Sequence, residues 1–110
     1  MVFDKVGTTS IVSQENVSIA NFLENLEKRY EKISNDNIII DLFSFDELSS
    51  GNVLEFLSLS EKHKNGNKSF ILVTDKIGYD DAPDAIDLVP TLQEAHDIIY
   101  MEEIERDLGI

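Results

Sequence analysis

The sequence contains no cysteine and only two histidines, His63 and His96. Without cysteine the chain forms no disulfide, has no thiolate nucleophile and offers no cysteine-based zinc site. Two histidines are too few for the multi-histidine metal cluster of a metallohydrolase. An enzyme built from this chain would depend on carboxylates, hydroxyls and a few lysines, so the sequence predicts a protein that is not an enzyme and has neither a metal nor a cofactor.

Basic residues are also scarce, since 9 Lys and Arg face 22 Asp and Glu and the net charge is −13. Nucleic-acid binding depends on Lys and Arg that neutralise phosphates, and anionic membrane surfaces attract the same residues. We therefore expect no nucleic-acid partner and no membrane partner. No apolar run approaches the roughly 20 residues of a membrane span, and the first residues, MVFDKVGTTS, lack a signal-peptide pattern, which predicts a cytoplasmic protein.

The acidic excess is concentrated in the last third of the chain. Residues 1–74 contain 11 acids and 7 bases, whereas residues 75–110 contain 11 acids and 2 bases. Glu102, Glu103 and Glu105 stand in the last turns of a predicted helix, where each anion opposes the helix dipole by about 0.3–1 kcal/mol. A basic partner protein bound by these residues would account for them, and so would an acidic face that favours solubility.

The apolar pattern is typical of an α/β domain. The length of 110 residues and the apolar content of 42% suit one domain over residues 1–110. The runs 37–42 and 69–74 predict buried parallel strands, with shorter strands at 2–3, 11–12 and 86–89. Helical spacing predicts helices over 19–33, from 49–50 to 62–67, and over 92–108. We expect a mixed, mostly parallel sheet of about five strands with three main helices.

Four segments of this pattern resemble a known family. They are the strand Asn37-Ile-Ile-Ile-Asp-Leu, the serine loop Ser49-Ser50-Gly51 that opens a helix, the strand Lys68-Ser-Phe-Ile-Leu-Val, and the segment Val89-Pro-Thr-Leu-Gln-Glu-Ala95. Together they resemble the STAS domain, the fold of bacterial anti-sigma-factor antagonists, over about residues 1–100. In that family the loop reads Asp-Ser-Ser-Gly, and here Leu48 replaces the aspartate.

The resemblance implies a non-enzymatic protein-interaction module in bacterial signalling, whose partner is an anti-sigma factor or a serine kinase. Carried over by position, the phosphoacceptor is Ser49, and Ser50 and Gly51 complete the partner loop. Asp46 and Glu47, just upstream, are candidate partner-binding residues. A phosphate would add a charge of about −1.5 to −2 to this loop. The residues alone favour a structural role in which one serine caps the helix and the other is a solvated turn residue, because capping by itself explains both residues.

Other hypotheses stay open at this stage. An accessory or subunit protein without a phospho-switch would dock a basic partner through its acidic C-terminal helix. Apolar residues on more than one face of that helix, including Met101 and Ile104, also allow a homodimer. A small hydrolase would need a deep pocket near Ser49.

The remaining polar features are predicted to be solvated. His63 lies between two lysines near a predicted helix end, and His96 is turned away from the apolar stripe of the last helix. We therefore expect both histidines at the surface. The acidic loop around residues 80–84 lacks the ligand spacing of a calcium loop.

Overall fold

The computed structural model describes residues 1–109, apart from the side chain of Tyr79. Five strands form one sheet: β1 (Val2–Val6), β2 (Thr9–Ser13), β3 (Asn37–Asp41), β4 (Phe70–Val73) and β5 (Asp87–Val89). The helices are α1 (Ile19–Ile33), α2 (Ser50–Leu54), α3 (Leu57–Asn65) and α4 (Leu92–Asp107), with a short 3₁₀ helix η1 (Tyr79–Asp81).

The strands follow one another in chain order across the sheet, β1-β2-β3-β4-β5. The β1–β2 pair is antiparallel and turns at Gly7, whose φ of +61° suits glycine. The pairs β2–β3, β3–β4 and β4–β5 are all parallel. The predicted mixed, mostly parallel five-stranded sheet is confirmed.

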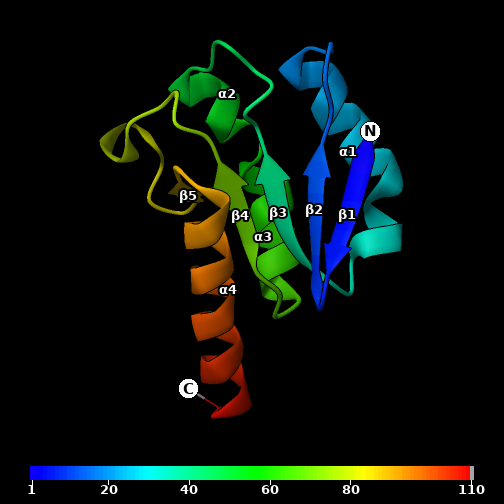
Figure 1. The fold of residues 1–110 in the computed structure, drawn as a ribbon, viewed down its shortest axis with the longest axis vertical. Helices are drawn as coiled ribbons and strands as arrows, with labels where there is room; N and C mark the ends of the chain where they lie inside the picture. Colours follow the sequence, from blue (N-terminus) through cyan, green and yellow to red (C-terminus); the bar gives the residue numbers. More distant parts are fainter. Residues whose placement is uncertain (110) are drawn as a thin grey trace.

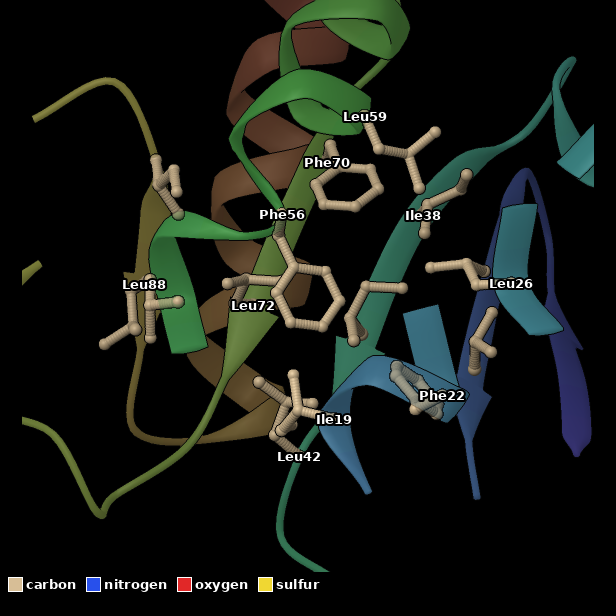
Figure 2. Close-up of a cluster of buried hydrophobic side chains, with 14 of the residues drawn as sticks. Ile19, Phe22, Leu26, Ile38, Leu42, Phe56, Leu59, Phe70, Leu72 and Leu88 are labelled. Atoms are coloured by element: carbon tan, nitrogen blue, oxygen red, sulfur yellow. The ribbon is translucent and has the colours of Figure 1, made fainter. Parts of the chain in front are cut away.

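Helices cover the sheet on both faces: α1 and α3 lie behind it in Figure 1, and α4 crosses in front. The side chains of β3 point alternately to the two faces of the sheet, so both faces need a helical layer. Ile38 and Ile40 point into the larger cluster of buried side chains, the main core, and Ile39 points into a second, smaller core on the other face. In Figure 2, Phe22 and Leu26 of α1 lie across the main core from Leu72 of β4. Two-sided burial explains why the strand is a continuous apolar run.

The predicted middle helix is divided into two, which the sequence pattern did not reveal. α2 ends at Leu54 and α3 starts at Leu57. Between them, Phe56 is fully buried and its ring lies 6.1 Å from that of Phe22. Insertion of this ring into the main core requires a change of direction that no proline or glycine marks (Figure 2).

Two buried serines have contrasting environments. The Ser60 hydroxyl, on α3, has no hydrogen-bond partner among the described residues, although the residue is fully buried. Ser69 is 1% exposed, and its hydroxyl donates to Glu102 Oε1 at 2.5 Å and accepts from Arg106 Nη1 at 3.3 Å. A buried hydroxyl without a partner is destabilising, whereas one in a charged network stabilises.

We therefore expect opposite effects when each hydroxyl is removed. Ser60→Ala should raise the free energy of unfolding by about 1 kcal/mol, and Ser69→Ala should lower it by about 1–3 kcal/mol. Urea denaturation followed by circular dichroism measures both values. A loss of stability in Ser60→Ala equal to that in Ser69→Ala would contradict the assignment.

Candidate functional site

The candidate serine loop leaves the carboxyl end of β3 and leads into α2, which lies beyond the tips of β3 and β4 at the top of Figure 1. Two apolar side chains hold the loop, because Phe45 and Leu48 are half-buried against the main core. The Phe45 ring meets Phe22 edge-on at 5.7 Å. The Ser44 hydroxyl adds a bond to the backbone oxygen of Gln14 at 2.8 Å. Packing thus anchors the loop. Leu48 contributes to this packing at the position where the family pattern has an aspartate.

The anchored loop exposes all of its predicted site residues. Asp46, Glu47, Ser49, Ser50 and Gly51 are all exposed to solvent. They occupy one short segment, so the structure brings these candidates together at the carboxyl edge of the sheet. The candidate glutamates of α4 lie elsewhere, toward the opposite end of the molecule (Figure 1).

Ser49 is the N-cap of α2, which confirms the capping interpretation for this residue. Its hydroxyl accepts from the backbone N–H of Asn52 at 3.1 Å and lies 3.1 Å from Asn52 Oδ1, to which it donates. Asn52 Oδ1 also accepts from the Ser49 backbone N–H at 2.9 Å, which completes a reciprocal capping box. Ser50 is exposed as the structural alternative expected, but it is the first residue of α2 and not a turn residue.

The fold itself does not require glycine at position 51. A Cβ atom built there would meet only the Ser49 hydroxyl, at an ordinary contact distance of 3.6 Å. Because glycine costs about 1 kcal/mol relative to alanine inside a helix, its presence at an exposed position is unfavourable for α2 alone.

The candidate glutamates of α4 have different surroundings. Glu102 and Glu103 are half-buried, whereas Glu105 is exposed. Glu103 Oε2 accepts from Thr8 Oγ1 at 2.8 Å and from Asn37 Nδ2 at 3.2 Å. Glu102 accepts from Ser69, as described above. Two of the three carboxylates therefore form bonds within the chain.

Asn37 is the centre of this network and is only 1% exposed. Its Oδ1 accepts from the Ser69 backbone N–H at 3.0 Å and from Arg106 Nη2 at 3.1 Å. The network joins the C-terminal half of α4 to the amino ends of β3 and β4. This anchoring accounts for Glu102 and Glu103 without a partner, and docking of a basic protein through them and Glu105 stays a prediction.

The prediction that His63 is exposed is wrong, because it is 1% exposed. Its Nε2 lies 2.7 Å from the backbone oxygen of Asp36, which can only accept, so Nε2 donates. Its Nδ1 lies 2.6 Å from the Tyr30 hydroxyl, which donates to it. The ring also packs edge-on against Phe70 at 6.0 Å. His96, in contrast, is half-exposed on α4.

Burial determines the ionisation of this group. Desolvation lowers the pKa of His63, with a further lowering from Lys68, and these effects outweigh the bond and charge of Asp36. Burial likewise raises the pKa of Tyr30, which keeps its hydroxyl proton for the bond to His63. The two lysines beside His63 in the sequence suggested an exposed position. In the structure Lys62 lies over the Tyr30 ring and Lys64 pairs with Asp87, while the His63 ring between them turns inward.

The carboxylate of Asp36 lies in the same region as this neutral pair. Burial by itself would raise the pKa of the Asp36 carboxyl, but hydrogen bonds from Ser10 and Lys5 and the charges of Lys5 and Lys68 lower it overall. The carboxylate accepts from Ser10 Oγ at 2.8 Å and from Lys5 Nζ at 3.1 Å. These bonds tie the β1–β2 hairpin to the turn after α1.

No group of three His, Asp or Glu among the described residues could hold a metal ion. One surface hollow is lined by residues 82–84 and 86–89 with Ile98, and another by Tyr30 with Lys62. Neither of these two hollows includes residues 49–51. Among the described helices, none is both long and apolar enough to cross a bilayer.

The sheet order and the two helical layers give the α/β fold that the sequence led us to expect from its resemblance to the STAS domain. A search of solved structures matches the chain to a serine-to-glutamate variant of RsbS from Moorella thermoacetica. The TM-score is 0.60 and the sequence identity 16%, over 90% of this chain and 96% of the RsbS chain. This likeness confirms the resemblance at the level of the fold. No family model and no curated protein matches the sequence.

The capping geometry predicts unequal roles for the two loop serines. Ser49→Ala should lower the free energy of unfolding by about 1 kcal/mol, because it removes the N-cap of α2. Ser50→Ala should change it by no more than about 0.5 kcal/mol, since the side chain is exposed. Urea denaturation of both variants measures the difference. Equal losses in the two variants would contradict a specific capping role for Ser49.

His63 predicts a loss of stability in mild acid. Because its pKa is lower in the folded chain than the usual value of 6.5, its contribution is complete above about pH 6.5 and is lost as the pH falls through the folded pKa. The free energy of unfolding should fall as the pH is lowered from 7.5 to 5, with a slope of at most about 1.4 kcal/mol for each pH unit below 6.5.

The control is His63→Phe, which should be less stable at every pH but should lack this slope. Asp36 contributes in the same direction only below its ordinary value of 3.8, so it does not interfere at pH 5. Urea denaturation at several pH values measures both proteins. Identical slopes in the wild type and in His63→Phe would refute the assignment.

Proposed function

We propose that this chain is a non-enzymatic, STAS-type protein-interaction module of bacterial signalling, and that phosphorylation of Ser49 weakens its complex with an anti-sigma factor or a serine kinase. One observation carries the proposal: Ser49 and Ser50 are exposed at the start of α2, on a loop that apolar side chains hold in place. The likeness of the fold to RsbS supports it.

The local chemistry supports Ser49 as the switch residue. Its hydroxyl proton is donated to Asn52 Oδ1, so esterification removes this donor, while an oxygen at the N-cap can still accept from the Asn52 backbone. The phosphate adds a charge of about −1.5 to −2 in the same loop as Asp46 and Glu47. Because the core is untouched, the added charge acts mainly on whatever contacts this surface.

The surroundings of the serines have the composition of a protein interface. Phe43 is 39% exposed and Leu54 is 50% exposed, so two large apolar side chains lie in the segments on either side of the serine pair. Asp46 and Glu47 add charge, and Gly51 leaves the start of α2 free of a side chain. Apolar groups bordered by charge are common at protein–protein interfaces. The fold does not require glycine at position 51, and close approach of a partner to the start of α2 would explain why Gly51 is there.

The test uses substitutions that separate charge from capping. Asp and Ser are about equally good N-caps, so Ser49→Asp adds charge while α2 stays capped, whereas Ser49→Ala removes the cap without adding charge. Ser58→Asp is the matched control, because Ser58 is also exposed but lies on α3. Each tagged protein is purified from the native host with its bound proteins, and the phosphorylated residues are mapped by mass spectrometry.

We expect phosphate on Ser49, and capture of the partner reduced at least tenfold by Ser49→Asp but not by Ser58→Asp. The purified partner is then titrated against each variant by calorimetry, which separates weaker binding from lower expression. Unchanged affinity in Ser49→Asp, with no phosphate at Ser49, would overturn the switch. Loss of binding in Ser49→Ala but not in Ser49→Asp would indicate that Ser49 has only a structural role, as the cap of α2.

A further inference from the structure

The helix α4 is apolar on two opposite faces. Ala95 and Ile99 are buried against the sheet. On the other side, Tyr100 is 68% exposed, Met101 60%, Ile104 42% and Leu108, at the C-cap, 68%. Because residues four apart share a helix face, residues 100, 104 and 108 form one line with Met101 beside it. We call these four side chains the outer stripe.

The outer stripe has no structural role among the described residues. The helix is already attached to the domain through its buried face and through the bonds of Glu102, Glu103 and Arg106. Scattered exposed apolar residues are normal on a protein surface, but several large ones grouped on one helix face mark a site of association. This grouping requires a separate explanation.

Acidic residues border the outer stripe. Asp97, Glu105 and Asp107 are exposed on the same helix. Arg106, the one basic residue of α4, is turned inward, where it donates to Asn37 and Ser69. Lys68 lies beside Tyr100 and Asp107, and Lys64 and Lys68 line a hollow with Glu105. These two lysines are partly exposed, so in this region the acids of α4 outnumber the exposed cations of the domain.

We propose that the outer stripe binds an amphipathic helix of another protein, one whose apolar face is bordered by Lys and Arg. The apolar side chains would supply the buried contact, and the acids of α4 would select the basic margins. A second copy of α4 is a poor partner for the same reason, because pairing the two outer stripes would place Asp97, Glu105 and Asp107 against the same three acids. Like charges across an interface are unfavourable.

This surface is independent of the serine loop. In Figure 1, α2 lies at the top and the C-terminal half of α4 at the bottom of the molecule, whose longest extent is 39 Å. A short helix on the outer stripe would therefore leave the serine loop accessible. The inference does not rest on the proposed switch, and either can fail without the other.

The experiment uses the whole chain, labelled with ¹⁵N, and a synthetic amphipathic peptide of Leu and Lys. A peptide with the same Leu pattern and Glu in place of Lys is the matched control. We expect the Leu/Lys peptide to shift the amide resonances of residues 97–108 saturably, and the Leu/Glu peptide to leave them unchanged. Binding should weaken as salt is added, because exposed charges contribute to it.

Variants of the chain identify the contact. The pair Met101→Gln with Ile104→Gln should weaken peptide binding at least tenfold, and Asp97→Asn with Glu105→Gln should weaken it and reduce its salt dependence. Leu54→Gln, which changes an equally exposed apolar residue on α2, should have no effect. All of these side chains are exposed, so the variants are expected to fold, and amide spectra without peptide verify this.

Three results would overturn the proposal. Shifts spread equally over the acidic loop at residues 80–84 would show binding by charge alone. Equal binding of the two peptides would remove the role of the acids. Sedimentation that detects a dimer of the free chain, lost in the Met101→Gln and Ile104→Gln pair, would show that the outer stripe is an interface between copies.

Discussion

Burial of β3 on both faces is the constraint on which the rest of the structure depends. This strand lies in the middle of the sheet, and its isoleucines point alternately into the two cores. Both functional candidates are attached to its ends. At the carboxyl end, the chain continues into the serine loop, and at the amino end, Asn37 holds the network that anchors α4. A strand that is buried from Asn37 to Ile40 thus fixes the positions of two surfaces at opposite ends of the domain.

The serine loop separates stability from recognition within a few residues. Phe45 and Leu48 pack against the main core, whereas Asp46, Glu47 and the two serines remain in water. A charge added to the exposed residues leaves the packed ones unaffected. In α4 the same separation runs around the helix instead of along the chain, since one face packs on the sheet and the other exposes the outer stripe.

Much of the fold could be predicted because its signals are local. Helix α1 has the predicted bounds, and α4 starts at the predicted residue, Leu92. The continuous apolar strands also lie where expected. The break between α2 and α3 was missed, because Phe56 fits the apolar spacing of one unbroken helix and only its place in the core redirects the chain. His63 was misplaced for a similar reason, as its burial depends on Tyr30 and the Asp36 backbone, both about 30 residues away.

By itself, the sequence determined most of the elements, the class of sheet and the position of the serine pair, because each depends on neighbouring residues, on periodicity or on turn chemistry. Only the tertiary structure decided how side chains distant in sequence meet. It buried His63, joined Glu102 and Glu103 to Ser69, Thr8 and Asn37, and left Glu105 in solvent. These outcomes depend on packing between elements. The local sequence around the three glutamates is nearly uniform in charge, so it contains no signal that distinguishes an anchoring carboxylate from a free one.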